Sequence, residues 1–322
     1  MSSIPLGPGA EFDIIRRILE GAEPPGPEIA VASGDDCALL RAEDFRYLAV
    51  TVDLTVEGAH FLPDWGTPEL VGGRAVRASV SDLAAMAAVP LGVLVALNVP
   101  GDSEARLAEQ VGAGCLNAAA ALGAPLIGGD LSRGGGALAL DVTALGLVER
   151  PLLRSGARPD DELWVTGQLG AAAAAVGAWK AGEPVPEEWS ERFWCPQPRL
   201  VEARWLSDHG ATAGIDLSDG LVADAGHIAA ASDLRIEIDW EEVPAATGVD
   251  PELALTGGED YELLVAAPDG IFGAEQVSEF ERTFGIPLTR VGRAVKGVGV
   301  RVFRDGKKVK LDSSGHDHFQ AG

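Results

Sequence analysis

Short acidic clusters recur along this chain, and apolar runs flank nearly all of them. A carboxylate at the end of an apolar run is costly to desolvate unless a positive group meets it. Few basic residues lie close to these clusters in sequence, so we expect metal ions to balance their charge. Such ions would in turn hold a phosphorylated substrate. The clusters are Gly34-Asp35-Asp36, Asp53, Ser81-Asp82, Gly128-Gly129-Asp130, Ile215–Gly220 and Gly257–Asp260.

Strand-like and helix-like patterns alternate along the sequence, which indicates an α/β or α+β class. Tyr47–Val52 reads as a buried strand with Asp53 at its end. A helix over Glu69–Ala88 places Ser81-Asp82 in its interior. Ser103–Leu122 reads as a helix capped by Asp102 or Ser103. Pro125–Ile127 is expected to be a short strand that ends at Gly-Gly-Asp.

The length and one composition break predict two domains. A chain of 322 residues is too long for one small core. The segment Glu149–Asp161, which reads ERPLLRSGARPDD, is rich in Pro, Arg and Asp. We therefore expect an N-terminal domain over residues 1–150 and a C-terminal domain over residues 151–322.

Charge and cysteine content exclude several classes of protein. Acidic residues outnumber basic ones 49 to 25, giving a formal charge of −24, and most of this excess is expected to be ordinary solvated surface. Nucleic-acid binding needs a basic footprint, which the chain lacks. The three cysteines are far apart in sequence, so a disulfide framework or thiolate zinc site is not expected. The first residues, MSSIPLGPGAEFD, show no signal-peptide pattern, so we expect a cytoplasmic location. The apolar stretches are too interrupted to span a bilayer, so we expect no membrane association.

Four of the acidic residues follow an apolar run directly or through a short glycine turn. Strand ends in such folds project side chains into a ligand-binding crevice. Several carboxylates in one crevice stay ionised only around cations, and an all-oxygen ligand set selects Mg²⁺, which bridges to nucleotide phosphates. Taken singly, each cluster can also be an ordinary turn or helix cap. The four residues are Asp36, Asp53, Asp130 and Asp216.

The sequence lacks the common nucleotide-binding signatures. No Gly-x-x-x-x-Gly-Lys-Ser/Thr is present, and no His-Arg-Asp is followed by Asp-Phe-Gly. Among the histidines, His60 stands out because it lies just beyond the Asp53 strand. His209 and His227 fall on expected helices and are interpreted as structural or surface residues.

Several long motifs occur in one order: GDDCALL, TVDLTVEGAHF, SVSDLAAM, LIGGDLSRG, GIDLSDGLVADAGHIA and TGGEDYELL. In these motifs the chain resembles the thiamine-monophosphate kinases, whose superfamily includes aminoimidazole ribonucleotide synthetase and selenophosphate synthetase. The resemblance runs from about residue 11 to the C-terminal GHDHF. It implies an α/β and α+β, two-domain aminoimidazole ribonucleotide synthetase-like fold, whose N-terminal sheet pairs across a homodimer.

The resemblance also implies roles for individual residues. Metal ligands are expected at Asp36, Thr51, Asp53, Asp82, Asp130, Asp216 and Asp219. ATP contacts are expected at Gly129, Asp130, Arg154 and Ser218. Contacts to the thiamine substrate are expected at His60, Glu259 and His316. Asp53, Asp130 and Asp216 are expected to be the catalytic residues.

Two positions depart from the family pattern. Where the family carries a threonine that ligates metal, this chain has Val52, so we expect that one ligand is lost or that water or Thr51 replaces it. Where the family carries an aromatic residue against the thiamine ring, this chain has His316.

The reaction implied is transfer of the ATP γ-phosphoryl group to thiamine monophosphate, with several Mg²⁺ ions and ATP as co-substrate. The sequence leaves three other functions open. They are an enzyme of the same superfamily with another acceptor, a non-catalytic nucleotide- and Mg²⁺-binding homologue, and a metal-dependent phosphohydrolase. A selenophosphate synthetase is disfavoured because the start of the chain has no reactive cysteine.

Overall fold

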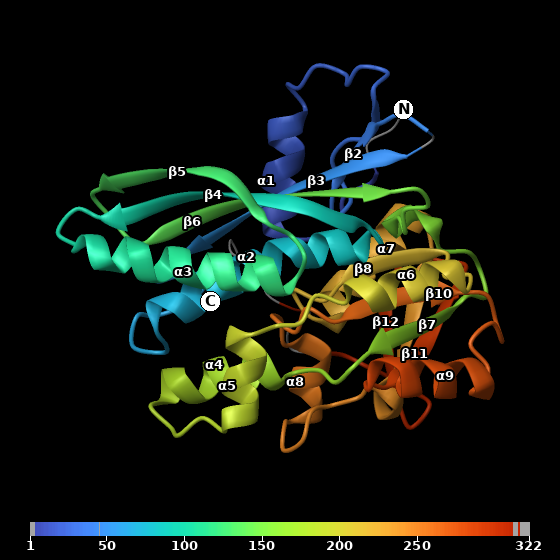
Figure 1. Ribbon diagram of the computed structural model, residues 1–322. Coiled ribbons are helices and arrows are strands. Elements are labelled where there is room, and N and C mark those ends of the chain that lie inside the picture. The colour runs from blue at the N-terminus through green and yellow to red at the C-terminus, as the bar shows by residue number, and fades with distance from the viewer. Residues whose placement is uncertain (1–3, 45, 312–314, 316–322) are drawn as a thin grey trace.

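Two β-sheets with separate helical layers make up the molecule (Figure 1). The computed structural model describes residues 4–44, 46–311 and 315. In spatial order, the first sheet consists of β1 (Ile29–Val31), β2 (Ala38–Arg41), β3 (Tyr47–Val56), β6 (Ala139–Val148), β4 (Val89–Pro100) and β5 (Leu126–Gly134). The second consists of β13 (Lys307–Val309), β12 (Gly299–Arg304), β9 (Arg235–Asp239), β11 (Leu288–Val295), β7 (Glu162–Thr166), β10 (Leu263–Ala267) and β8 (Ala213–Asp216).

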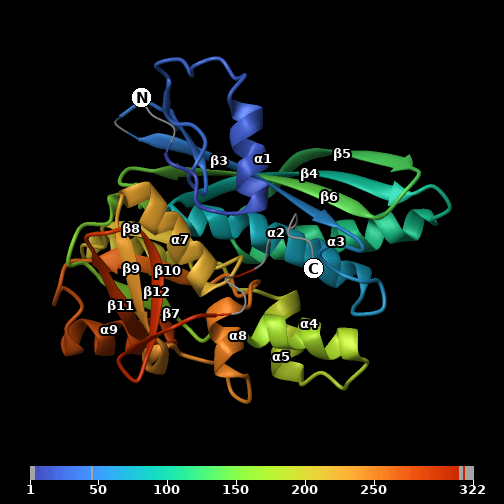
Figure 2. The same ribbon diagram turned by 180° about the vertical axis from the view of Figure 1, so that it is seen from behind.

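Two helices cover one face of the first sheet: α2 (Pro68–Ala85) and α3 (Ala105–Ala121) (Figures 1 and 2). Strand β6 alternates, so Leu140, Val142 and Ala144 are buried in the core. The strands pair antiparallel, except that β4 and β5 run parallel because α3 makes the crossover between them. Helix α2 begins where Thr67 accepts the N–H of Leu70 and Pro68 occupies the first turn.

The second sheet is covered on both faces. Helix α7 (Leu221–Ser232) packs on one face with the alternating residues Leu163 and Val165 of β7. The intervening Trp164 packs on the other face with α6 (Leu200–Asp208) and α9 (Ala274–Phe284). Strands β7, β8 and β10 are therefore buried on both sides, and every residue of β10 is buried, whereas β12 and β13 at the other edge of the sheet are largely exposed.

The remaining helices lie at the margins of the two sheets. We call each sheet with its helices a lobe. Helix α1 (Ala10–Leu19) contacts the second lobe through Phe12, whose ring lies 4.4 Å from that of His227 in α7. Helices α4 (Ala171–Ala181), α5 (Glu187–Trp194) and α8 (Pro251–Thr256) lie below α2 in Figure 1. Short 3₁₀ helices, η1 (Arg154–Gly156) and η2 (Trp240–Glu242), complete the described elements.

Several expected boundaries were wrong. Strand β3 continues to Val56, so Asp53 lies inside it, because ten consecutive residues pair with β6. Gly128–Asp130 lies inside β5, where the parallel ladder with β4 carries the chain through the glycines to Gly134. Helix α3 begins after Glu104, and neither predicted capping residue caps it.

Helix α2 lies between the two lobes and contacts both. Its residue Ala85, with Ala87 just beyond it, packs into the core formed by Trp164, Leu206 and Phe280 of the second lobe. One helix can therefore present side chains to groups of either lobe. Within the described residues, no helix is both long enough and apolar enough to span a membrane.

Candidate functional site

A cleft of about 320 Å³ lies between the two lobes and collects most of the predicted site residues. Its first-lobe wall comes from β3, the following loop and α2, and its second-lobe wall comes from α4 and two loops. The predicted site residues in its lining are Asp53, His60, Asp82, Asp216, Ser218, Asp219 and Glu259.

Three carboxylates from both lobes meet at one point. One oxygen each of Asp36, Asp82 and Asp216 lies within 4.8 Å of the others. Asp36 comes from the turn between β1 and β2, Asp82 from α2, and Asp216 from the end of β8. Thr51 Oγ1 donates a hydrogen bond to Asp82, and Ser81 Oγ donates one of 2.6 Å to Asp216. The two hydroxyl groups orient the carboxylates of Asp82 and Asp216.

Crowding and burial make these carboxylates unfavourable as bare anions. Burial, with the nearby Asp36, raises the pKa of Asp216 to about 7. Burial, followed by Asp216 and Asp36, raises the pKa of Asp82 well above its usual range. A cation at this point would reverse the effect, because it favours the ionised carboxylates.

Arg154 is the cation that meets this cluster. Its guanidinium nitrogen lies 2.6 Å from Asp36 Oδ1, and its backbone N–H donates to Asp35 at 3.1 Å. Both side chains of the Arg154–Asp36 pair are largely buried. Although burial opposes protonation, the neighbouring Asp36 raises the pKa of Arg154 above its ordinary value. Arg154 thus stays charged and offsets part of the negative charge of this cluster.

A second group in the cleft is centred on Glu259. The buried Arg74 forms an ion pair with this carboxylate, and the Tyr261 hydroxyl donates to it at 2.9 Å. Burial raises the pKa of Glu259, but Arg74 and Tyr261 outweigh it and hold the pKa below the usual value. Burial and the proximity of Glu259 raise the pKa of Asp53, which connects this group to the three carboxylates.

The loop that carries Glu259 is tightly held and strained. Glu259 has φ 73° and Tyr261 has φ 51°, in the left-handed region that non-glycine residues rarely adopt. The loop is held because the Glu259 N–H donates to Ser218 O and the Tyr261 N–H donates to Leu217 O, each at 2.8 Å. Ser218 and Glu259, distant in sequence, therefore lie side by side.

His60 is oriented by its own loop. Its Nδ1 accepts the Val56 N–H at 3.1 Å, so a neutral ring carries its proton on Nε2. The His60 backbone N–H also donates to Val56 O. This local turn directs the imidazole into the cleft beside Asp53 and Glu259.

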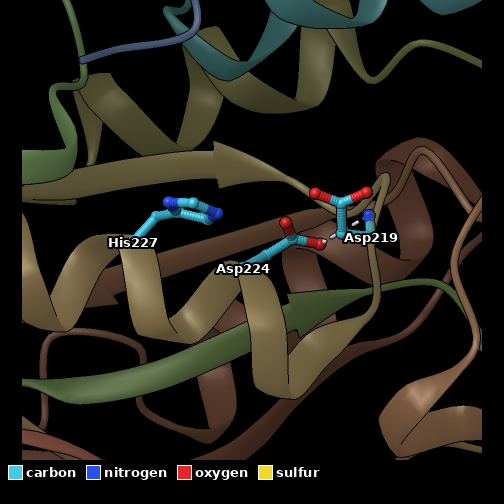
Figure 3. Close-up of side chains that lie close together, drawn as sticks. All are labelled: Asp219, Asp224 and His227. Atoms are coloured by element: carbon cyan, nitrogen blue, oxygen red, sulfur yellow. Dashed lines mark hydrogen bonds between the residues drawn. The ribbon is translucent and has the colours of Figure 1, made fainter. Parts of the chain in front are cut away.

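Asp219 belongs to the cleft and to a second close group with Asp224 and His227 (Figure 3). The Asp224 carboxylate accepts the backbone N–H groups of Asp219 and Gly220, at 3.1 and 3.0 Å. His227 is buried, and burial lowers its pKa to about 3, so its ring is neutral. Asp224 therefore acts as a brace that holds the Ser218–Asp219 turn at the start of α7.

Gly129 and Asp130 lie elsewhere. With Gly128 they line a second cleft of about 920 Å³ between α3 and β5. Almost all residues of β5 are exposed. A Cβ on Gly129 would come within 2.0 Å of Val95 O, so the close pairing of β4 and β5 requires glycine there. Within this single chain these two residues are not brought to the three-carboxylate point. His316 lies outside the described residues.

Sequence reasoning missed the residues that position the predicted ones. Arg74, Ser81 and Tyr261 contact Glu259 or Asp216, and none was expected to have a role in the site. One signal was available: Arg74 is a basic residue on the helix face that also carries Val71, Ala75 and Ala78. A buried cation among small apolar residues needs an anionic partner, which here is Glu259.

Both halves of the chain match known domain families. The first matches the AIR synthase related protein, N-terminal domain, over residues 34–148, and the second matches the AIR synthase related protein, C-terminal domain, over residues 158–305. The two-sheet fold with its interlobe carboxylate cleft is thus that of the AIR synthase related proteins.

Comparison with individual proteins narrows the class. The chain is 36% identical to the thiamine-monophosphate kinase of Escherichia coli K12, over 96% of this chain and 98% of that protein. It is 33% identical to that of Pyrococcus horikoshii, over 97% of each. The solved structure of AaThiL complexed with AMPPCP and TMP superposes with a TM-score of 0.79 at 32% identity, covering 95% of each chain. The chain belongs to the thiamine-monophosphate kinase family.

Proposed function

We propose that this protein transfers the γ-phosphoryl group of ATP to the phosphate of thiamine monophosphate, giving thiamine diphosphate. The observation that carries the proposal is the three-carboxylate point, where Asp36 pairs with Arg154 while Asp82 and Asp216 line the interlobe cleft together with His60 and Glu259. The family membership, and a relative solved with AMPPCP and TMP together, support the same reaction.

The donor atoms at the carboxylate point fit Mg²⁺. They are all oxygens, and they lie within 4.8 Å of one another, near the about 4.2 Å that separates opposite ligands of one Mg²⁺ ion. We assign Asp36, Asp82 and Asp216 as ligands, with Asp53, Asp219 and Thr51 as further oxygen donors around them. Bound Mg²⁺ would neutralise the phosphate charges and hold the two polyanions together.

The chain's own residues position the reactants. Arg154 and Ser218 hold the triphosphate, while His60 and Glu259 hold the thiamine portion. The acceptor is a phosphate oxygen that is already ionised at neutral pH, so no general base is required. It attacks the γ-phosphorus in line, the bond to the β,γ-bridging oxygen breaks, and ADP departs with that electron pair.

We further propose a homodimer built on the open face of the first sheet. Val52 and Leu54 of β3 are 61% and 51% exposed, on the face opposite α2 and α3. Ile127 of β5, which lies against Gly92, is 56% exposed on the same face, whereas Leu131, 63% exposed, pairs with Leu97 and lies on the α3 side of the β5 edge. A second copy would cover this apolar face and the unpaired β5 edge, and would place another chain beside Gly129 and Asp130. Light scattering that gives one 33.3 kDa chain at assay concentration would contradict it.

The test of the reaction is direct. Purified protein is incubated with Mg-ATP and thiamine monophosphate, and the products are separated by chromatography. We expect thiamine diphosphate and ADP in equal amounts. Binding of ATP without product, or release of inorganic phosphate without a thiamine product, would contradict the proposal.

We also assign residues 1–150 and 151–322 as the two domains. Expression of each piece and measurement of its cooperative unfolding would test that division.

A further inference from the structure

One aromatic side chain in the cleft has no role in the arrangement described so far. Trp65 lines the same cavity as His60 and Glu259. It lies in the loop between β3 and α2, five residues after His60. A single loop therefore supplies both an imidazole and an indole to the cavity.

Trp65 is held in place from behind. Its ring stacks on Trp179 of α4 at 5.2 Å and 15°, and meets Phe193 of α5 edge-on at 6.0 Å. The next residue, Gly66, lies so close to Trp194 that a Cβ there would come within 2.6 Å of the indole. These contacts fix the indole at modest entropic cost, which makes it a preorganised surface for a planar ligand.

The Trp65 indole and the three carboxylates Asp36, Asp82 and Asp216 are held by different sets of residues. Phe193, which touches Trp65, also carries the Arg74 guanidinium 4.0 Å from its ring centroid, and Arg74 pairs with Glu259. The three-carboxylate point has its own partners in Thr51, Ser81 and Arg154. An acceptor with its phosphate at that point would place its rings among Trp65, His60 and Glu259.

We infer that Trp65 is a specificity-determining residue that packs against the cationic ring of the phosphate acceptor. This inference rests on the proposed function. Thiamine monophosphate carries a permanently charged thiazolium next to its phosphate arm, and an indole face attracts such a cation more strongly than any other side-chain ring. The cleft lining also contains the exposed Lys180, but carboxylates in the lining outnumber it. The charge of the cleft therefore also favours a cationic ring.

The experiment measures steady-state kinetics of Trp65→Leu and Trp65→Phe in the full chain with Mg-ATP. We expect Trp65→Leu to raise KM for thiamine monophosphate about 10-fold, and Trp65→Phe to raise it about 3-fold. KM for ATP should stay within 2-fold of wild type for both. The matched control is Trp240→Leu, which removes a tryptophan that carries Arg304 over its ring and is not among the cleft residues.

A second arm tests the role of charge. The probe is the isostere of thiamine monophosphate in which a neutral thiophene replaces the thiazolium, used as a competitive inhibitor. Trp65→Leu should weaken the cationic acceptor several-fold more than the neutral isostere. Equal losses for both, or an unchanged KM for thiamine monophosphate, would overturn the inference, as would a parallel rise in KM for ATP with a lowered Tm.

Failure of the proposed function has a different signature. If the wild type gives no thiamine diphosphate, calorimetric binding of thiamine monophosphate in the presence of AMPPCP and Mg²⁺ replaces the kinetic assay. Weaker binding by Trp65→Leu than by wild type and Trp240→Leu would then uphold the role of Trp65. Equal binding by all three would overturn it.

Discussion

At the scale of single residues, the pairing of Arg74 with Glu259 is the contact on which the substrate end of the cleft depends. Arg74 is buried, donates to Phe193 O and Glu259, and lies over the Phe193 ring. Arg74→Met removes the charge and leaves Glu259 buried without a cation. We expect a loss of about 3–5 kcal/mol in the free energy of unfolding, measured by urea titration, and a raised KM for thiamine monophosphate.

The double variant Arg74→Met/Glu259→Gln is the informative control, because it also removes the orphaned carboxylate. Its stability should recover by about 1–3 kcal/mol relative to Arg74→Met, while its KM stays high. Arg74→Lys should lower stability less than either variant, because lysine keeps the positive charge although it lacks the planar guanidinium and its several N–H donors. If Arg74→Met and the double variant unfold at the same urea concentration, the ion pair does not hold Glu259.

At the scale of elements, the crossing of α2 and α3 is set by two glycines. A Cβ on Gly114 would meet Glu69 O at 1.9 Å, and one on Gly72 would meet Val111 O at 2.0 Å. Both obstacles are backbone atoms, so the helices must move apart to admit a methyl group. We expect Gly114→Ala to destabilise the protein by about 2–4 kcal/mol, measured by urea or thermal unfolding.

Helix α3 contains its own control. Gly112 is on the same helix, and a Cβ there meets nothing within 4 Å. Gly112→Ala should therefore be neutral or stabilising by about 0.5–1 kcal/mol, because alanine has the higher helix propensity. Equal effects of the two substitutions would show that close helix packing is not what requires Gly114.

Elements with a clear period could be predicted from the sequence, and their ends could not. The apolar spacing within Glu69–Ala88 located α2 to within three residues. Asp53 and Gly128–Asp130 were placed at strand ends, because the apolar runs stop there. Ladder pairing carries β3 and β5 further, since partners on β6 and β4 continue beyond the apolar segment. Pairing between distant segments is invisible to a local pattern.

At the scale of the whole molecule, the carboxylate point exists only because the two lobes are docked. The apolar runs predicted that Asp36 and Asp216 would share a crevice with Asp53 and Asp130, and the family resemblance added Asp82 to the expected metal ligands. Their neutralising partner could not be read locally, because Arg154 is 118 residues from Asp36. Ser81 was likewise noted only as part of a Ser-Asp pair, although its hydroxyl joins α2 to β8 through Asp216.

This docking predicts how stability depends on pH and Mg²⁺. In the folded chain the pKa of Asp216 is about 7, against a usual 3.8. Between these values the folded state binds more protons than the unfolded state. Without metal, stability should therefore fall as pH rises from about 4 to 7, by up to about 1.4 kcal/mol per unit for this group, and level off above 7. Mg²⁺ should restore it, because it binds the ionised carboxylates of the folded state.

Asp216→Asn tests this argument, since the amide oxygen can still accept from Ser81 but carries no charge. In EDTA at pH 8 we expect the variant to be as stable as wild type or more so, by about 1–3 kcal/mol, because a repelling carboxylate is gone. Its Tm should change less between pH 5 and 8, and it should gain less from Mg²⁺. Formation of thiamine diphosphate should fall at least about 100-fold. Asp102→Asn, in an exposed turn, should match wild type throughout. If Asp216→Asn is less stable than wild type in EDTA at pH 8, these carboxylates are already neutralised by groups of the chain itself. That result would contradict the proposal that Mg²⁺ binds them between the lobes.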